Sequence, residues 1–175
     1  LIDAGWNVAC WNRTPKGHAA EVSNPEEAIE GAGVVSIYLK DAPAIREVVG
    51  RISAAMEPDQ IFLNHSTIDL ETTKWLDETC RERGCRFLDA PFTGSMLAAQ
   101  SGQLVYYIGG DRSLSEGLET FLTVTSKARI FCGPVGAAPV IKLTTNLISA
   151  CTVQAMAEAL AITTGHDVAA ERLIE

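Results

Sequence analysis

Hydrophobic and polar positions divide the chain into two kinds of segment. Short apolar runs predict buried strands, and longer segments with apolar residues every three or four positions predict helices. Strands are expected at 6–11, 33–39, 60–63, 85–88, 104–108 and 129–132. Helices are expected at 24–30, 41–49, 69–83, 113–121 and 137–164, with a helix end at 1–5 and a last helix capped by Asp167. This alternation is typical of an α/β protein with a doubly wound parallel sheet.

The long C-terminal helix contains the residues that most resemble a catalytic pair. Its apolar neighbours predict that it is largely buried, and Lys142 and Asn146 lie four positions apart, on one face. Burial lowers the pKa of a lysine, so that it can exchange a proton with a substrate oxygen. The alternative is a lysine that extends to solvent beside a surface asparagine.

A second candidate site follows the first expected strand. Asn12, Arg13 and Thr14 precede Pro15 in a turn at the carboxyl end of that strand, where ligands of open α/β sheets bind. An arginine there would meet the 2′-phosphate of NADP, whereas an acidic residue would favour NAD. A solvated turn arginine is the equal alternative.

A third candidate is the loop of small residues after the fourth expected strand. Thr93, Gly94 and Ser95 offer backbone N–H groups and two hydroxyls just before a helical segment. Such a loop can hold an anion such as a carboxylate. A plain Ser/Thr turn with a helix cap is the commoner alternative.

Charge and composition exclude several classes of partner. The 175 residues carry a net charge of −8, which argues against nucleic acid and against anionic membrane surfaces. No apolar run is judged long enough to cross a bilayer. Five scattered cysteines are interpreted as reduced residues of a cytoplasmic protein. No two histidines have metal-ligand spacing, so no metal is predicted. His65 beside Ser66 lacks the G-x-S-x-G turn of a hydrolase.

Four motifs occur together in a recognisable order. They are Trp11-Asn-Arg-Thr14, Asn64-His-Ser-Thr67, Asp89-Ala-Pro-Phe-Thr-Gly-Ser95 with Gly102-Gln-Leu104, and Gly133-Pro-Val-Gly136 followed by Lys142 and Asn146. Together they resemble the β-hydroxyacid dehydrogenase family, which includes 3-hydroxyisobutyrate dehydrogenase, glyoxylate/succinic semialdehyde reductase and 6-phosphogluconate dehydrogenase. The resemblance covers nearly the whole chain.

The resemblance implies a role for each motif. Lys142 would protonate the carbonyl oxygen, and Asn146 would orient the substrate. Thr93, Gly94 and Ser95 would bind its carboxylate, although the position of Ser95 is often glycine in the family. Thr67 would lie near the nicotinamide, and Leu39 in the loop near the cofactor. Asn12, Arg13 and Thr14 would meet the adenosine end of NADP(H), with NAD(H) as the alternative cofactor.

The same resemblance implies that the chain is a fragment. The family's first strand and its G-x-G-x-x-G loop are expected before Leu1, and most of its helical domain after Glu175. The expected domains are a truncated dinucleotide-binding domain at 1–135 and, at 136–175, an interdomain helix with the start of an all-α domain. A homodimer or homotetramer is expected at full length, and these 175 residues alone are expected to bind nucleotide poorly. Thr145 departs from the asparagine found there in many members.

The expected activity is NADP(H)-dependent hydride transfer to or from a small β-hydroxy acid or its semialdehyde, of the 3-hydroxyisobutyrate, succinic semialdehyde or glyoxylate type. A non-catalytic nucleotide-binding module on the same fold is the alternative, although such a module is expected to lack the lysine. An imine-reductase-like enzyme would have another residue in place of Lys142. A sugar-phosphate substrate is disfavoured because no Lys/Arg cluster lies near Thr93 or Asn146.

Overall fold

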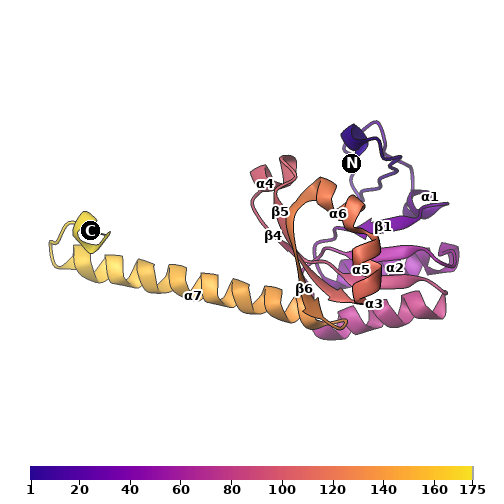
Figure 1. Ribbon diagram of the computed structural model, residues 1–175. Helices are drawn as coiled ribbons and strands as arrows, with labels where there is room; N and C mark the ends of the chain where they lie inside the picture. The colour runs from indigo at the N-terminus through magenta and orange to yellow at the C-terminus, as the bar shows by residue number, and fades with distance from the viewer. Residues whose placement is uncertain (175) are drawn as a thin grey trace. The chain divides into compact units, whose positions relative to one another are not determined.

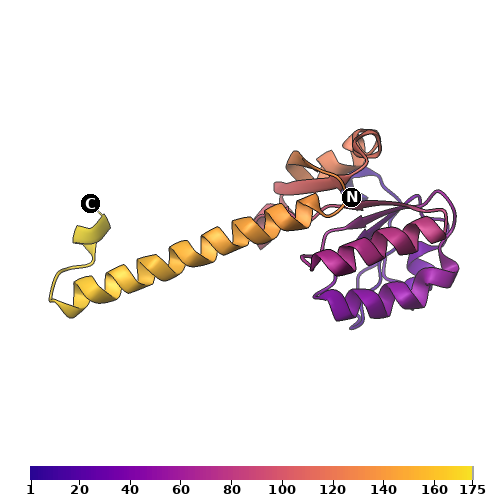
Figure 2. The same ribbon diagram turned by 90° about the horizontal axis from the view of Figure 1, so that it is seen from below.

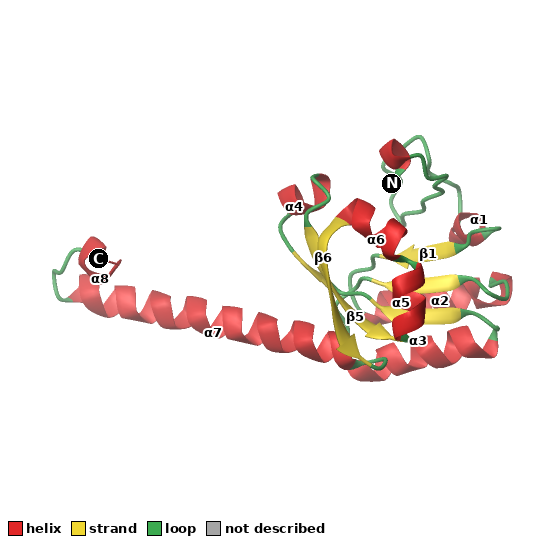
Figure 3. Cartoon of the chain, in the orientation of Figure 1, coloured by secondary structure: helices red, strands yellow, loops and turns green. Residues whose placement is uncertain are grey.

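The computed structural model describes residues 1–174 of the chain (Figure 1). The chain forms two compact units, Leu1–Lys142 and Leu143–Glu175. The first unit contains every strand of the described residues, and the second consists of helix (Figure 3).

One six-stranded sheet organises the first unit. Its strands are β1 (Val34–Ile37), β2 (Ile61–Asn64), β3 (Arg86–Asp89), β4 (Phe92–Thr93), β5 (Leu104–Gly110) and β6 (Ser126–Gly133). The order is β1-β2-β3-β5-β4, and β6 pairs with β5. Strands β1, β2 and β3 are parallel, as are β5 and β6, while β5 is antiparallel to β3 and β4. The α/β class is therefore confirmed, with a parallel-rich sheet that contains antiparallel pairs.

Helices cover both faces of this sheet. The helices of the described residues are η1 (Ile2–Ala4), α1 (Pro25–Ile29), α2 (Ala42–Ile52), η2 (Ser53–Ala55), α3 (Leu70–Glu82), α4 (Met96–Gln100), α5 (Arg112–Gly117), α6 (Glu119–Thr125), α7 (Ala137–Gly165) and α8 (Glu171–Ile174). Helices α2 and α3 lie on one face of the sheet, and α5 and α6 lie on the other. Figure 2 shows α2 and α3 side by side.

Alternation along the strands creates two separate cores. Phe62 and Phe87 belong to a cluster with apolar residues of α2 and α3, whereas Leu63 and Leu88 belong to another with those of α5 and α6. Successive side chains of a strand point to opposite faces, so each strand serves both cores. This is the doubly wound arrangement that the apolar runs predicted.

Side-chain caps determine where the helices of the first unit begin. Asn24 accepts a hydrogen bond from the N–H of Glu27, and Asp41 and Asp69 cap α2 and α3 in the same way. Each cap satisfies one of the N–H groups that a helix start leaves unpaired. These starts were predicted from the sequence and are confirmed.

The prediction of a strand at 6–11 is wrong. The segment has no ladder, only an isolated bridge between Cys10 and Glu21. A strand forms only where a neighbour accepts and donates its backbone hydrogen bonds, and β1 pairs with β2 alone among the described residues. The β-prone composition therefore did not suffice.

Three expectations about the C-terminal part are also wrong. Leu143, Leu147 and Ile148 of α7 are exposed rather than buried, because among the described residues only the first turn of the helix is covered. By length and composition alone α7 is long and apolar enough to cross a bilayer, contrary to the expectation that no apolar run is long enough. Asp167 has a positive φ of 59° and ends a turn, and α8 begins only at Glu171.

Candidate functional site

The carboxyl ends of three parallel strands meet at one edge of the sheet. The last residues of β1, β2 and β3 are paired in register, Ile37 with Asn64 and Asn64 with Asp89. The loops after β1 and β2 contain Leu39 and Thr67, so the topology gathers these two predicted site residues at one edge, while β3 leads into β4, which contains Thr93. This is the edge at which ligands of open α/β sheets bind.

A hydrogen bond joins these two loops. The Leu39 N–H donates to Oγ of the buried Ser66 at 2.8 Å. Asn64 stabilises the second loop from below, since its amide donates to the Ser66 carbonyl and accepts from the Ser66 N–H, both at 3.2 Å. Leu39 is half-buried against the core, and Thr67, which follows Ser66, is exposed. The serine therefore holds the loops together rather than acting as a nucleophile.

Aromatic side chains form a floor beneath the loops. Tyr38 stacks on His65 with ring centroids 4.4 Å apart, and His65 contacts Tyr106 at 4.9 Å. Phe92 packs edge-on against Tyr106 at 6.4 Å and lies 6.2 Å from Tyr38. We call these four residues the aromatic floor. Tyr38 precedes Leu39 and His65 precedes Ser66, so the ring contacts link the loops after β1 and β2 to Tyr106 of β5.

His65 is neutral within this floor. It is fully buried, and burial lowers its pKa to about 4. Its Nδ1 lies 2.9 Å from the Ala90 carbonyl, an acceptor, so Nδ1 carries the proton. Nε2 is buried without a hydrogen-bond partner among the described residues. The histidine thus supports the end of β3 and does not activate Ser66.

Asp89 connects the end of β3 to the start of α7. Its Oδ2 accepts a hydrogen bond from the N–H of Gly136, the residue before α7. Gly136 has a φ of 94°, which favours glycine, and a side chain there would collide with Leu70. The strand that leads to Thr93 is therefore tied to the helix that contains Lys142.

Lys142 is half-buried on α7, in the first unit. Burial lowers the pKa of its ammonium group. That shift has the direction that proton exchange near neutral pH requires. Asn146 lies four residues further along α7, in the second unit, and is exposed.

Thr93, Gly94 and Ser95 are all exposed. The Ser95 hydroxyl accepts from the Ala98 N–H at 3.2 Å and caps α4, so the capping alternative holds for this residue. Gly94 has a φ of 140°, and a Cβ there would lie 2.9 Å from Leu104. Only glycine fits this turn, which leaves the backbone beside Thr93 open to a ligand.

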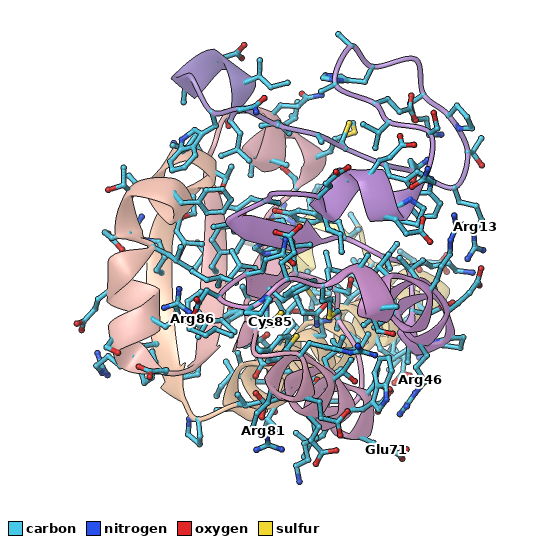
Figure 4. All side chains as sticks on the ribbon, turned by 90° about the vertical axis from the view of Figure 1, so that its right-hand side faces the viewer. Arg13, Arg46, Glu71, Arg81, Cys85 and Arg86 are labelled. Atoms are coloured by element: carbon cyan, nitrogen blue, oxygen red, sulfur yellow. The ribbon has the colours of Figure 1, made fainter. Side chains whose placement is uncertain are left out.

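Asn12, Arg13 and Thr14 lie apart from these loops, beside an open hollow of about 430 Å³ lined by Trp11, Arg13, His18 and Glu21 among others. The Asn12 amide donates to the Thr14 carbonyl at 2.6 Å. Arg13 pairs with Glu47 of α2 at 2.8 Å, and both side chains are more than 60% exposed. Figure 4 shows Arg13 at the surface, on the same side of the first unit as Arg46.

These features fit a nicotinamide dinucleotide. An exposed ion pair is worth about 0–1 kcal/mol, so Glu47 holds Arg13 only weakly and a phosphate can compete for the guanidinium. The loops with Leu39 and Thr67 are accessible at the sheet edge where such ligands bind.

Sequence reasoning missed the aromatic floor and Asp89. Tyr38 and Tyr106 lie in expected strands and Phe92 in no expected element, and the sequence does not show that their rings meet. The pairing of β4 with β5 places Phe92 opposite Tyr106, and Tyr38 contacts Phe92 from the loop after β1. For Asp89 a signal existed, because a carboxylate at the end of an apolar strand is unusual in a core.

Comparison with known proteins places this geometry in context. Residues 1–134 match the family model described as the NAD binding domain of 6-phosphogluconate dehydrogenase. Glyoxylate/succinic semialdehyde reductase 1 of Arabidopsis thaliana is 28% identical over 185 residues, covering 100% of this chain and 64% of the relative. The mouse cytokine-like nuclear factor N-PAC is also 28% identical, over 93% of this chain and 30% of the relative.

Among solved structures, a Mycobacterium tuberculosis 3-hydroxyisobutyrate dehydrogenase with L-serine superposes with a TM-score of 0.92 at 26% identity. The match covers 98% of this chain and 62% of that one. The chain thus spans between 30% and 64% of the length of these three proteins.

Proposed function

The chain belongs to the family of the NAD-binding domain of 6-phosphogluconate dehydrogenase, and on that basis we propose that it serves an NADP(H)-dependent oxidoreductase. The substrate would be a small β-hydroxy acid or the matching semialdehyde, such as 3-hydroxyisobutyrate, succinic semialdehyde or glyoxylate. The observation that carries the proposal is the match of residues 1–134 to that family model, and the contact of Asp89 with Gly136 adds that the helix of Lys142 is tied to the strand before Thr93.

Substrate binding would use the exposed backbone and hydroxyl at Thr93 and Gly94. Backbone N–H groups and a hydroxyl are suited to a carboxylate, and Ser95 keeps the turn in place as the cap of α4. Binding the remote carboxylate holds the reacting carbon in position, which lowers the entropic part of the barrier. Asn146 would orient the same substrate through its amide.

Lys142 would manage the proton. In the reducing direction its ammonium donates a proton to the carbonyl oxygen, and in the oxidising direction the neutral amine accepts it from the hydroxyl. Partial burial supports both directions because it brings the pKa of the lysine closer to neutrality.

Leu39 and Thr67 would contact the nicotinamide end of the cofactor, and Asn12, Arg13 and Thr14 its adenosine end. The cofactor supplies the hydride when it is bound. Arg13 supports NADP(H) over NAD(H), since a guanidinium pairs well with a 2′-phosphate.

We further propose a dinucleotide-binding domain at 1–135 and the start of a helical domain at 136–175. The exposed apolar residues of α7 support a homodimer or homotetramer in which this helix is covered. All five cysteines are free thiols, which supports a reducing compartment such as the cytoplasm.

The experiment compares two aldehydes of the same length. NADPH oxidation by the full gene product is followed with succinic semialdehyde and with butanal, which lacks the carboxylate. We expect turnover of the semialdehyde and a kcat/KM for butanal that is lower by about 10²-fold or more, because the loss of a charged anchor costs several kcal/mol. Equal rates would contradict the carboxylate site, and no oxidation with either aldehyde or with glyoxylate would contradict the proposed reaction.

A second candidate is a nucleotide-binding module without turnover. It is favoured by the similarity to N-PAC, whose name is that of a nuclear factor and not of an enzyme. Tight NADPH binding with no oxidation of the cofactor by any of the three aldehydes would support it.

A further inference from the structure

Asp89 is an unusual carboxylate. It lies at the end of β3 and has no exposed surface. Oδ2 accepts from the Gly136 N–H, whereas Oδ1 is buried without a hydrogen-bond partner among the described residues. A buried carboxyl group with one unsatisfied oxygen destabilises the folded protein, so its presence here needs an explanation.

Three segments converge on this carboxylate. A Cβ added to Gly109 of β5 would lie 2.8 Å from Asp89 Oδ2, 3.1 Å from the Pro134 carbonyl and 3.2 Å from the Ala138 nitrogen. The glycine therefore allows β5, the turn before α7 and the first turn of α7 to close around the carboxylate. The first N–H groups of a helix carry a partial positive charge, which favours an anion at this place.

The surroundings of Asp89 favour its ionised form only in part. Burial raises the pKa of Asp89 to about 7, the hydrogen bond from Gly136 opposes this shift, and Asp77 of α3 adds to it. From β6 the neighbouring group is the Cys132 thiol, whose pKa is raised by burial and, to a smaller extent, by Asp89. His65, which donates to the adjacent Ala90 carbonyl, is neutral. The carboxyl group thus changes its charge state in the range in which a cell works.

We propose that Asp89 is a positioning residue whose ionised carboxylate holds the first turn of α7, and through it Lys142, in the place that proton transfer requires. Lys142 lies on α7, six residues after Gly136, so a shift of the helix start moves the amine with it. An ionised acceptor binds an N–H group about twice as strongly as a neutral one. Protonation of Asp89 therefore loosens the start of α7. This inference rests on the proposed function.

The test uses the full gene product and the variant Asp89→Asn, which keeps the size and one acceptor oxygen but is neutral at every pH. The first measurement does not depend on activity. Amide hydrogen exchange of residues 136–140, corrected for intrinsic exchange rates, is followed from pH 5.5 to pH 8.5. We expect protection in the parent protein to increase as the pH rises through about 7, and no such increase in the variant.

The second measurement is the pH profile of kcat with NADPH and succinic semialdehyde. The parent should show an acid limb near pH 7, and Asp89→Asn should lose this limb and about 10²-fold in kcat while its KM for NADPH stays the same. A limb that persists in the variant, together with unchanged protection, would overturn the proposal. If the parent shows no turnover, the proposed function fails, and the exchange measurement alone then decides whether Asp89 holds α7.

A second variant covers the case in which Asp89→Asn does not fold. Gly109→Ala pushes a methyl group toward Oδ2 from β5 and should reduce protection at residues 136–140. Gly117→Ala is the matched control, because a Cβ there meets nothing within 4 Å. Equal protection in the two alanine variants would overturn the proposal.

Discussion

Arg13 determines cofactor preference if the proposed adenosine-end loop is right. In Arg13→Asp an acidic side chain replaces the guanidinium that would pair with the 2′-phosphate, and it repels that phosphate. We expect the ratio of NADPH to NADH in kcat/KM to fall by about 10- to 100-fold, since a hydrogen bond to a charged group contributes about 1.5–3 kcal/mol.

The partner of Arg13 supplies the control. Glu47→Gln removes the negative charge that competes for the guanidinium, so the preference for NADPH should stay the same or increase. A preference that does not respond to Arg13→Asp would contradict the assignment of this loop.

His65 makes the stability of the fold sensitive to acid. Its pKa is lowered from 6.5 to about 4, so the unfolded chain binds more protons between these values. Its contribution is therefore complete above pH 6.5 and is lost as the pH falls toward 4, by up to about 3 kcal/mol. For global unfolding, which exposes the carboxyl group to water, Asp89 has the opposite sign and loses its contribution as the pH rises through about 7. The local loosening of α7 proposed above differs, because it breaks the hydrogen bond from Gly136 while the carboxyl group stays buried.

His65→Phe separates this effect from other titrations. The phenyl ring can keep the stacking with Tyr38 but cannot gain a proton. Between pH 7.5 and pH 4.5 the variant should lose less free energy of unfolding than the parent, as measured by urea titration. Equal losses would show that His65 is not neutral in the folded protein.

At the scale of single residues, the sequence predicted local structure, such as helix starts, better than the partners that come from distant segments. The helix starts at Asn24 and Asp69 were predicted and are correct, and each of these side chains caps its helix. Ser66 and His65 are adjacent in the sequence, yet their partners are Leu39 and Ala90, from the segments that follow β1 and β3. Such partners depend on strand pairing, which no local pattern specifies.

At the scale of elements, apolar runs located five of the expected strands because a buried strand needs a continuous apolar sequence. The same rule failed at 6–11, where no neighbour pairs with the segment among the described residues. The direction of β5, antiparallel to β3, was also not predictable, since strand direction depends on the connection and not on composition.

For α7 the sequence predicted the element but not its surroundings. A helix at 137–164 was predicted and is found at Ala137–Gly165, but its exposure was not predicted. A helix that is apolar all round must be covered by something, and composition alone does not distinguish protein from lipid.

At the scale of the whole molecule, the apolar residues of α7 predict self-association. Leu147 and Val153 are 63% and 67% exposed. We expect the full gene product to sediment as a dimer or tetramer, and Leu147→Asp with Val153→Asp to reduce its mass, because a buried charge without a partner destabilises an interface. Analytical ultracentrifugation measures both.

Two outcomes would contradict this expectation. A monomer in the parent protein would show that another surface or partner covers α7. Association with lipid vesicles in place of a soluble oligomer would show that the apolar helix meets a bilayer.

The most direct test of the proposed chemistry is the initial rate of NADPH oxidation with succinic semialdehyde in the parent, Lys142→Ala and Lys142→Arg. Alanine removes the proton donor, and arginine keeps the charge but does not release a proton near neutral pH. We expect both variants to lose about 10²- to 10⁴-fold in kcat while they still bind NADPH. A rate in Lys142→Ala close to that of the parent would show that Lys142 is not the residue that transfers the proton.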